Sequence, residues 1–166
     1  KAAPVKWDQK IVKESAYAQA VVVNSGIANA CTGAEGYGYC QETAEKMSEV
    51  LGIPTEAVLV GSTGVIGMQL PMDKITAGVE QLVEVKNTSI EAGTAAAQAI
   101  MTTDTCKKEI ALQVEIDGVT VTIGGMAKGS GMIHPNMATM LGVITTDLAI
   151  TKELLLEAIR SDVIDS

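Results

Sequence analysis

The sequence is nearly devoid of aromatic residues, with one Trp, three Tyr and no Phe in 166 residues. Its 47% hydrophobic content therefore comes mainly from aliphatic side chains, alanine and eight methionines, which is enough for one domain with a real core. Sixteen glycines indicate many tight turns and close backbone approaches. We expect a small aliphatic domain with short, glycine-punctuated elements.

Basic residues are also scarce. Twelve Lys and Arg against twenty Asp and Glu give a formal net charge of −8, and the basic residues form no stripe. Nucleic acid binding needs such a stripe to displace counterions, so that function is disfavoured. No apolar run approaches the roughly 20 residues of a membrane span, and the chain does not open like a signal peptide. We therefore expect neither nucleic acid nor membrane as a partner.

Metal ligands are few as well. Cys31, Cys40 and Cys106 are widely spaced and form no CxxC pair, and His134 is the only histidine. This set makes no plausible zinc site, so no metal is expected. Buried reduced thiols in a cytoplasmic protein are the simpler explanation of the cysteines.

Periodicity predicts a mixture of strands and helices. Residues 20–24 (AVVVN) are typical of a buried strand followed by a glycine-rich loop, and residues 57–67 (AVLVGSTGVIG) of a strand entering another such loop. Apolar residues at helical spacing predict helices over these ranges: 40–51, ended by Gly52 and Pro54; 71–82; 89–101; and from 151 onward, capped by Thr151.

The clearest local pattern is a β-hairpin over residues 109–125. Apolar and polar residues alternate on both sides of Asp117-Gly118, a dipeptide that two-residue hairpin turns prefer. Residues 140–147 (MLGVITTD) predict another buried strand. Strands and helices with an antiparallel hairpin favour an α/β or α+β layer protein. Because neither Lys1 nor Ser166 is a natural boundary, we expect residues 1–166 to be a single partial domain.

Common catalytic motifs do not match. The sequence GSG at 129–131 lacks the outer spacing of a G-x-S-x-G elbow, and no second histidine is present for a triad. The stretch GGMAKGS is not in P-loop order, and residues 36–38 lack the third glycine of a dinucleotide fingerprint. His134 could act as a general base, but a lone histidine beside a proline is more often a turn residue, and that interpretation is favoured.

Residues 128–141 (KGSGMIHPNMATML) suggest a different nucleophile. A threonine without a histidine base becomes nucleophilic when the preceding peptide bond is cut, because the new α-amine, with a pKa of about 7.7–8.0, can act as base. Thr139 follows the small Ala138, and the glycine- and proline-containing approach could strain the bond between them. From spacing alone, an ordinary Ala-Thr step before a strand remains the alternative.

Four motifs together resemble the glutamate N-acetyltransferase family, also called ornithine acetyltransferases: NSGIANACTG, GSTGVIG, MTTDT and GGMAKGSGMIHPNMATML. They lie in the family's order and span most of the chain. One departure is Ile27, where the family typically has Asn, and we expect it to loosen a loop hydrogen bond without removing chemistry. The resemblance implies an α+β fold, a four-layer α/β/β/α sandwich shared with self-processing aminopeptidases.

The resemblance also implies a reaction. A precursor cuts itself between Ala138 and Thr139, so that residues 1–138 belong to an α chain and residues 139–166 begin a β chain. Thr139 then takes the acetyl group of N-acetylornithine and passes it to glutamate in arginine biosynthesis, a ping-pong transfer through an acetyl-threonine that needs no cofactor. Some family members also use acetyl-CoA as donor. The cleaved chains assemble as α₂β₂ heterotetramers.

The same resemblance assigns an oxyanion hole to STG: the Thr63 hydroxyl and the Gly64 backbone N–H. Acyl transfer builds negative charge on a carbonyl oxygen, which preorganised donors stabilise. Without the family, a simple strand-to-helix turn would be favoured here.

Substrate binding is assigned by resemblance to Lys128, Thr139 and a threonine of MTTDT. Lys128 could hold a substrate carboxylate or assist at the nucleophile, with a solvated loop lysine as the alternative. We place the threonine at Thr102, and Thr103 and Thr105 remain alternatives.

Parts of the family's chain that this sequence lacks supply further substrate contacts, including an acidic residue, so the isolated chain is expected to be inactive. Two other functions stay open: a self-processing N-terminal-nucleophile aminopeptidase of the same fold, and a non-catalytic module whose glycine-rich loops hold an anion through backbone N–H groups. Replacing Thr139 by Ala would leave anion binding intact but would abolish processing and transfer.

Overall fold

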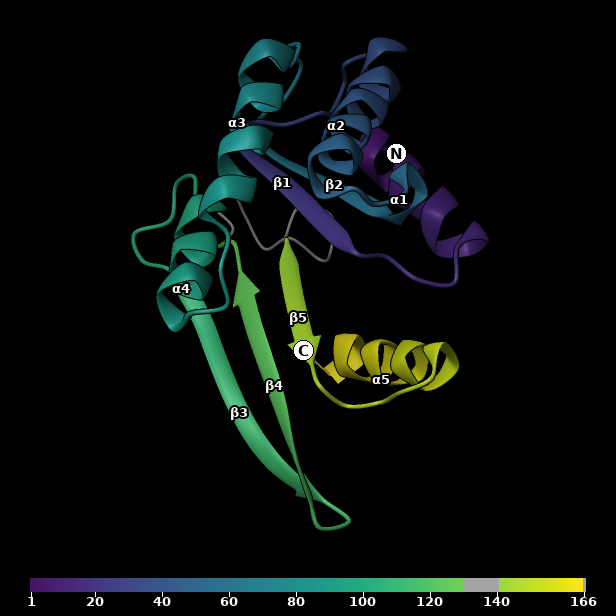
Figure 1. Ribbon diagram of the computed structural model, residues 1–166, viewed down its shortest axis with the longest axis vertical. Helices are drawn as coiled ribbons and strands as arrows, with labels where there is room; N and C mark the ends of the chain where they lie inside the picture. Colours follow the sequence, from purple (N-terminus) through teal and green to yellow (C-terminus); the bar gives the residue numbers. More distant parts are fainter. Residues whose placement is uncertain (130–140, 166) are drawn as a thin grey trace. The chain divides into compact units, whose positions relative to one another are not determined.

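The computed structural model describes residues 1–129 and 141–165, which pack as two compact units. The first unit comprises residues 1–108 and the described part of 127–141, and the second comprises 109–126 and the described part of 142–166. Both units combine helices and strands (Figure 1). Within the described residues, no helix is long and apolar enough to cross a membrane.

The first unit contains the following elements in chain order: α1 (Ala3–Glu14), β1 (Ala20–Ile27), α2 (Glu35–Leu51), the 3-10 helix η1 (Thr55–Ala57), β2 (Val58–Val65), α3 (Met72–Val85) and α4 (Ile90–Ala99). The remaining elements are β3 (Lys108–Ile116), β4 (Val119–Ala127), β5 (Gly142–Thr146) and α5 (Lys152–Asp165). Every predicted strand and helix is therefore present, and α1 is an additional helix that the periodicity did not indicate.

Strands β1 and β2 pair in parallel, from Ala20 opposite Val58 to Ile27 opposite Val65. Helices α1, α2 and α3 supply the other side chains of one apolar core, whose buried members are Trp7, Ile11, Val22, Cys40, Ala44, Met47, Val58, Val60 and Val79. The predicted helical faces are confirmed where they meet this core. Leu82 on α3 and Ile90 on α4, by contrast, are exposed.

Polar contacts fasten α1 to β2. The Trp7 indole N–H donates to the Val58 carbonyl at 3.0 Å, and the Asp8 carboxylate accepts from the Val60 N–H at 2.9 Å. Trp7 also packs on Tyr37 of α2, with ring centroids 5.6 Å apart. Burial raises the pKa of Asp8 above its ordinary value, although the hydrogen bond from Val60 partly opposes this shift.

Replacing Asp8 by Asn is expected to leave stability at neutral pH unchanged or slightly higher. The amide oxygen can still accept from Val60, and no charge is then desolvated. Since the folded-state pKa of Asp8 lies above the unfolded value, the wild type loses stability relative to this variant as pH rises through that pKa. Urea unfolding at several pH values from 3 to 7 measures the difference, and a variant less stable at pH 7 would contradict the expectation.

The end of α2 at Gly52 and the cap of α5 at Thr151 are confirmed, whereas α2 begins earlier and α3 ends later than predicted. Gly52 ends α2 with φ 66°, and its N–H donates to the Ser48 carbonyl at 2.9 Å. The Ser89 hydroxyl caps α4 by accepting from the Ala92 N–H, and the Thr151 hydroxyl accepts from the Leu154 N–H at the start of α5.

Both strands of the parallel pair run further than predicted. β1 continues past Asn24 to Ile27, and β2 continues through STG to Val65. Gly26 (φ 112°) and Gly64 (φ 129°) lie opposite one another, and only glycine adopts such φ angles readily. The prediction of a glycine loop at STG was therefore wrong, and the alternative of a strand-to-helix turn is also contradicted.

The second sheet has the strand order β3–β4–β5 (Figure 1). The predicted hairpin is confirmed: Asp117 (φ 51°) and Gly118 (φ 78°) form its turn, both with the positive φ of a type I′ turn. The strand predicted within residues 140–147 is present as β5, but its predicted burial is wrong, because Ile144 is 71% exposed. Apolar side chains of β3 are likewise exposed: Ile110, Leu112, Val114 and Ile116.

Candidate active site

Thr63 and Gly64 lie at the carboxyl end of a parallel strand pair. Their partners in β1 are Ser25 and Gly26, at the same end of the pair. Thr63 is half-buried and Gly64 is exposed. Ligands of open α/β sheets bind beyond the carboxyl ends of the strands, so both residues stand where a substrate can approach.

The backbones of β1 and β2 approach closely at Gly64. A Cβ there would collide with the carbonyl group of Gly26 and with the Ile27 nitrogen. Gly64 is therefore required by the contact with β1, in addition to any role of its N–H.

Ser62, the residue before Thr63, is hydrogen-bonded to the end of β1 and to the loop that follows it. Its hydroxyl donates to the Ile27 carbonyl at 3.1 Å and accepts from the Asn29 N–H at 2.8 Å. The Asn24 amide also donates to the Ile27 carbonyl, at 2.7 Å. Ile27 thus serves these bonds through its main chain, which any residue at that position would supply.

The Asn29 side chain secures the same loop to α2. Its amide donates to the Gly36 carbonyl at 2.7 Å and to Cys40 Sγ at 3.3 Å, and its oxygen accepts from the Thr32 hydroxyl at 2.7 Å. Burial raises the pKa of Cys40 to about 12, so this thiol stays protonated. Of the cysteines predicted to be buried, only Cys40 is, since Cys31 and Cys106 are exposed.

Ser25 links this end of the strand pair to the segment that carries Thr102. Its hydroxyl donates to the carbonyl of Ala99, the last residue of α4, at 2.5 Å. Thr102 follows three residues later. The two predicted regions, Thr63–Gly64 and Thr102, are thus connected through a strand pairing and one hydrogen bond.

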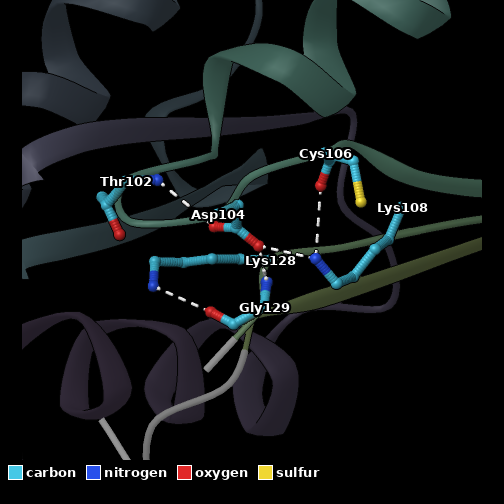
Figure 2. A network of polar contacts seen from close by, with 6 residues as sticks. All are labelled: Thr102, Asp104, Cys106, Lys108, Lys128 and Gly129. Carbon is cyan, nitrogen blue, oxygen red and sulfur yellow. Dashed lines mark hydrogen bonds and ion pairs between the residues drawn. The ribbon is translucent and has the colours of Figure 1, made fainter. Parts of the chain in front are cut away.

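Asp104 is the centre of a polar network (Figure 2). Its carboxylate accepts from Lys108 Nζ at 2.9 Å, from the Gly129 N–H at 2.6 Å and from the Thr102 N–H at 3.3 Å. The Asp104 side chain is only 1% exposed. Chiefly because of the hydrogen bond from Lys108, the pKa of Asp104 falls to about 2.

Lys128 is buried, with 7% of its surface exposed. Its ammonium donates to the Gly129 carbonyl at 3.2 Å, and its backbone N–H donates to the Leu141 carbonyl at 2.9 Å. No acidic side chain among residues 1–129 and 141–165 forms an ion pair with it. The alternative of a solvated loop lysine is therefore wrong.

The structure unites part of the predicted site. Thr102 and Lys128 meet in the Asp104 network through main-chain groups, Thr102 directly and Lys128 through its neighbour Gly129 (Figure 2). Thr102 is exposed, as are Thr103 and Thr105, so the choice of substrate-binding threonine stays a prediction.

Some predicted residues lie outside the described part of the chain: Ala138, Thr139 and His134. The cleavage site and the nucleophile therefore remain predictions. Asp104 and Asn29 were not predicted from the sequence. The only indication of a role for Asp104 was a lysine four residues later, and nothing in the sequence distinguished Asn29 from other loop asparagines. Within the described residues, no three His, Cys, Asp or Glu side chains gather as a metal site would require.

Comparison with solved structures gives the fold class. The arginine biosynthesis bifunctional protein argJ of Bacillus halodurans is 46% identical and matches with a TM-score of 0.76 over 85% of this chain and 71% of that one. An ornithine acetyltransferase of Mycobacterium tuberculosis, solved in complex with ornithine, is 38% identical and matches with a TM-score of 0.68, over 85% and 72% of the two chains. This chain has the α+β fold of these proteins.

Sequence comparison gives the family. The ArgJ family model matches residues 1–166. The arginine biosynthesis bifunctional proteins ArgJ of Symbiobacterium thermophilum and Thermotoga neapolitana are 54% and 50% identical over 96% and 100% of this chain. The chain therefore belongs to the ArgJ family. It spans 39% and 41% of these two relatives, about two fifths of their length.

Proposed function

We propose that the complete protein moves an acetyl group from N-acetylornithine to glutamate in arginine biosynthesis. Thr139, freed by self-cleavage after Ala138, carries the acetyl group between the two substrates. Family membership and the relatives' names support this proposal, as does the ornithine bound in the Mycobacterium tuberculosis structure. No step of the proposed transfer calls for a cofactor, and acetyl-CoA is a second donor to be tested.

The burial of Lys128, only 7% exposed, is the observation that carries the proposal furthest. A lysine with so little exposed surface is stabilised by a nearby anion, and among the described residues the Lys128 ammonium has only the Gly129 carbonyl as acceptor. N-acetylornithine and glutamate both carry an α-carboxylate that would pair with it. Leu141, which accepts from the Lys128 backbone, follows Thr139 by two residues in the sequence, so a nucleophile at 139 suits a site built around Lys128.

Thr63 and Gly64 supply the proposed oxyanion hole. As acetyl-threonine forms, the acetyl carbonyl oxygen becomes negative, and the Thr63 hydroxyl and Gly64 N–H would donate to it. Ser62, which precedes Thr63, is held in place before the charge develops by its hydrogen bonds with Ile27 and Asn29. Rigid donors of this kind need no rearrangement during the reaction.

The finer architecture is also proposed. The exposed apolar residues of β3 suit a sheet that packs on another sheet, as a four-layer α/β/β/α sandwich requires. Residues 1–138 would end the α chain and residues 139–166 begin the β chain, with α₂β₂ assembly in the cytoplasm. Segments absent from this chain would complete the substrate site.

The denatured mass of the full-length protein after brief exposure to N-acetylornithine tests the proposal. Two chains split between Ala138 and Thr139, with one acetyl group on the Thr139 chain, are expected. Subsequent glutamate should remove that group as N-acetylglutamate. Cleavage with turnover of small peptide amides instead would indicate an aminopeptidase, and a single unmodified chain from folded protein would indicate a binding module.

Replacing Lys128 by Met in the full-length enzyme is expected to raise the KM for N-acetylornithine by about 10–100-fold. The substitution keeps most of the buried stem and removes the charge that pairs with the carboxylate, an interaction of roughly 1.5–3 kcal/mol. Initial-rate kinetics measure the change. Lys86→Met, at an exposed lysine just after α3, is the matched control, and an unchanged KM in Lys128→Met would reject the carboxylate role.

A further inference from the structure

Three donors converge on the buried Asp104 carboxylate from separate parts of the first unit. Oδ1 accepts from Lys108 Nζ, at the start of β3, and from the Gly129 N–H, two residues beyond the end of β4. Oδ2 accepts from the Thr102 N–H, in the turn after α4 (Figure 2). One side chain therefore fixes two main-chain segments that are 27 residues apart in the sequence.

Gly129 fits this arrangement closely. A Cβ at that position would collide with Asp104 Oδ1 and would press on the Lys108 ammonium. The Lys108 ammonium also donates to the Cys106 carbonyl at 3.2 Å, which anchors it beside the carboxylate. The position of the Gly129 main chain is thus set by direct contact with Asp104 and leaves little freedom to its neighbour, Lys128.

We propose that Asp104 is a positioning residue for acetyl transfer: by holding the Gly129 main chain, it aims the neighbouring Lys128 ammonium at the substrate carboxylate. This inference rests on the function proposed above. Asp104 would not itself touch substrate, because its side chain is 1% exposed and both oxygens already accept hydrogen bonds.

The negative charge of Asp104 is essential to this role. All three partners are donors, so they need a group that accepts at both oxygens. An Asn side chain of the same shape offers one acceptor, and its NH₂ group would face an N–H or the Lys108 ammonium. With its pKa lowered to about 2, Asp104 remains ionised at any pH used for assay.

The test compares full-length wild type with Asp104→Asn, Lys128→Met and the double variant. Asp104→Asn is expected to raise the KM for N-acetylornithine at least tenfold and to change kcat much less. Because Asp104 acts through Lys128, the double variant should have the KM of Lys128→Met alone. The inference would be overturned if the increases in KM of the two single variants multiplied in the double variant, or if Asp104→Asn kept the wild-type KM.

Two further variants keep the test decisive. Asp117→Asn makes the same chemical change at the exposed hairpin turn, where Asn tolerates positive φ, and should keep wild-type KM and kcat. If Asp104→Asn does not fold, Lys108→Met takes its place, with a smaller rise in KM that again does not multiply with Lys128→Met. An unchanged KM in that variant would overturn the inference.

The wild-type enzyme separates the two proposals. If wild type fails to transfer acetyl groups from N-acetylornithine, the proposed function is at fault. If wild type transfers them and the Asp104 variants keep its KM, only the positioning role is rejected.

Discussion

Full-length Thr139→Ala is expected to remain one uncut chain that takes up no acetyl group. The substitution removes the hydroxyl that would attack the Ala138 carbonyl during self-cleavage and, later, the acetyl group of N-acetylornithine. Transfer should fall by at least about a thousandfold, since loss of a nucleophile removes the covalent route altogether. Denatured mass and transfer rate measure both losses in the same preparation.

Two matched variants show whether the effect belongs to this hydroxyl. Thr139→Ser keeps a hydroxyl and, after cleavage, an adjacent α-amine, so it should still cut and transfer, more slowly than wild type. Thr151→Ala makes the same change at the cap of α5, where it should cost about 1 kcal/mol of stability and leave cleavage intact. Normal cleavage of Thr139→Ala would move the nucleophile elsewhere and remove the basis of the proposed mechanism.

Gly64→Ala is expected to give the second large effect, on stability and activity together. At φ 129° an L side chain is strained, which costs about 1–3 kcal/mol, and the added methyl group collides with the Gly26 carbonyl, which costs about 1–3 kcal/mol more. Separating β2 from β1 also displaces a proposed oxyanion donor, so kcat should fall by roughly a hundredfold. Urea unfolding and steady-state kinetics measure the two effects.

Gly26→Ala is the control for backbone strain. Gly26 has a similar positive φ, 112°, and lies directly opposite Gly64, but no atom lies within 4 Å of a Cβ built there. Its cost should therefore be the strain alone, about 1–3 kcal/mol. Equal losses of unfolding free energy in the two variants would mean that the close approach of the strands is unimportant.

Local structure follows from short-range chemistry, and most of it could be predicted. The turn at Asp117-Gly118, the end of α2 at Gly52 and the caps at Ser89 and Thr151 depend on a few neighbouring residues. The ends of β1 and β2 could not be predicted, because glycine normally signals a turn. At Gly64 it instead allows two strands to approach, which depends on a partner 38 residues away.

The burial of individual side chains and the residues of the candidate site were harder to predict, because they too depend on partners distant in the sequence. Lys128 has the sequence context of a loop lysine. In the structure it is buried, with its backbone N–H bonded to the Leu141 carbonyl and its ammonium to the Gly129 carbonyl. Asp104 resembles any polar residue after a helix, and its function in the network becomes visible only when Gly129 is brought to it by the β3–β4 hairpin. Apolar alternation predicted β3 correctly, but it does not reveal whether the apolar side chains are covered.

The Asp104 carboxylate also closes a loop, since it holds Lys108 at the start of the hairpin and Gly129 just after its end. The entropy of closing this loop grows only with the logarithm of its length, by about 0.6 kcal/mol per doubling. Extra residues between Asp117 and Gly118 would therefore lengthen the hairpin without weakening the Asp104 hydrogen bonds at its two ends. The hairpin tip is accordingly a suitable place to insert a peptide tag or a fluorophore.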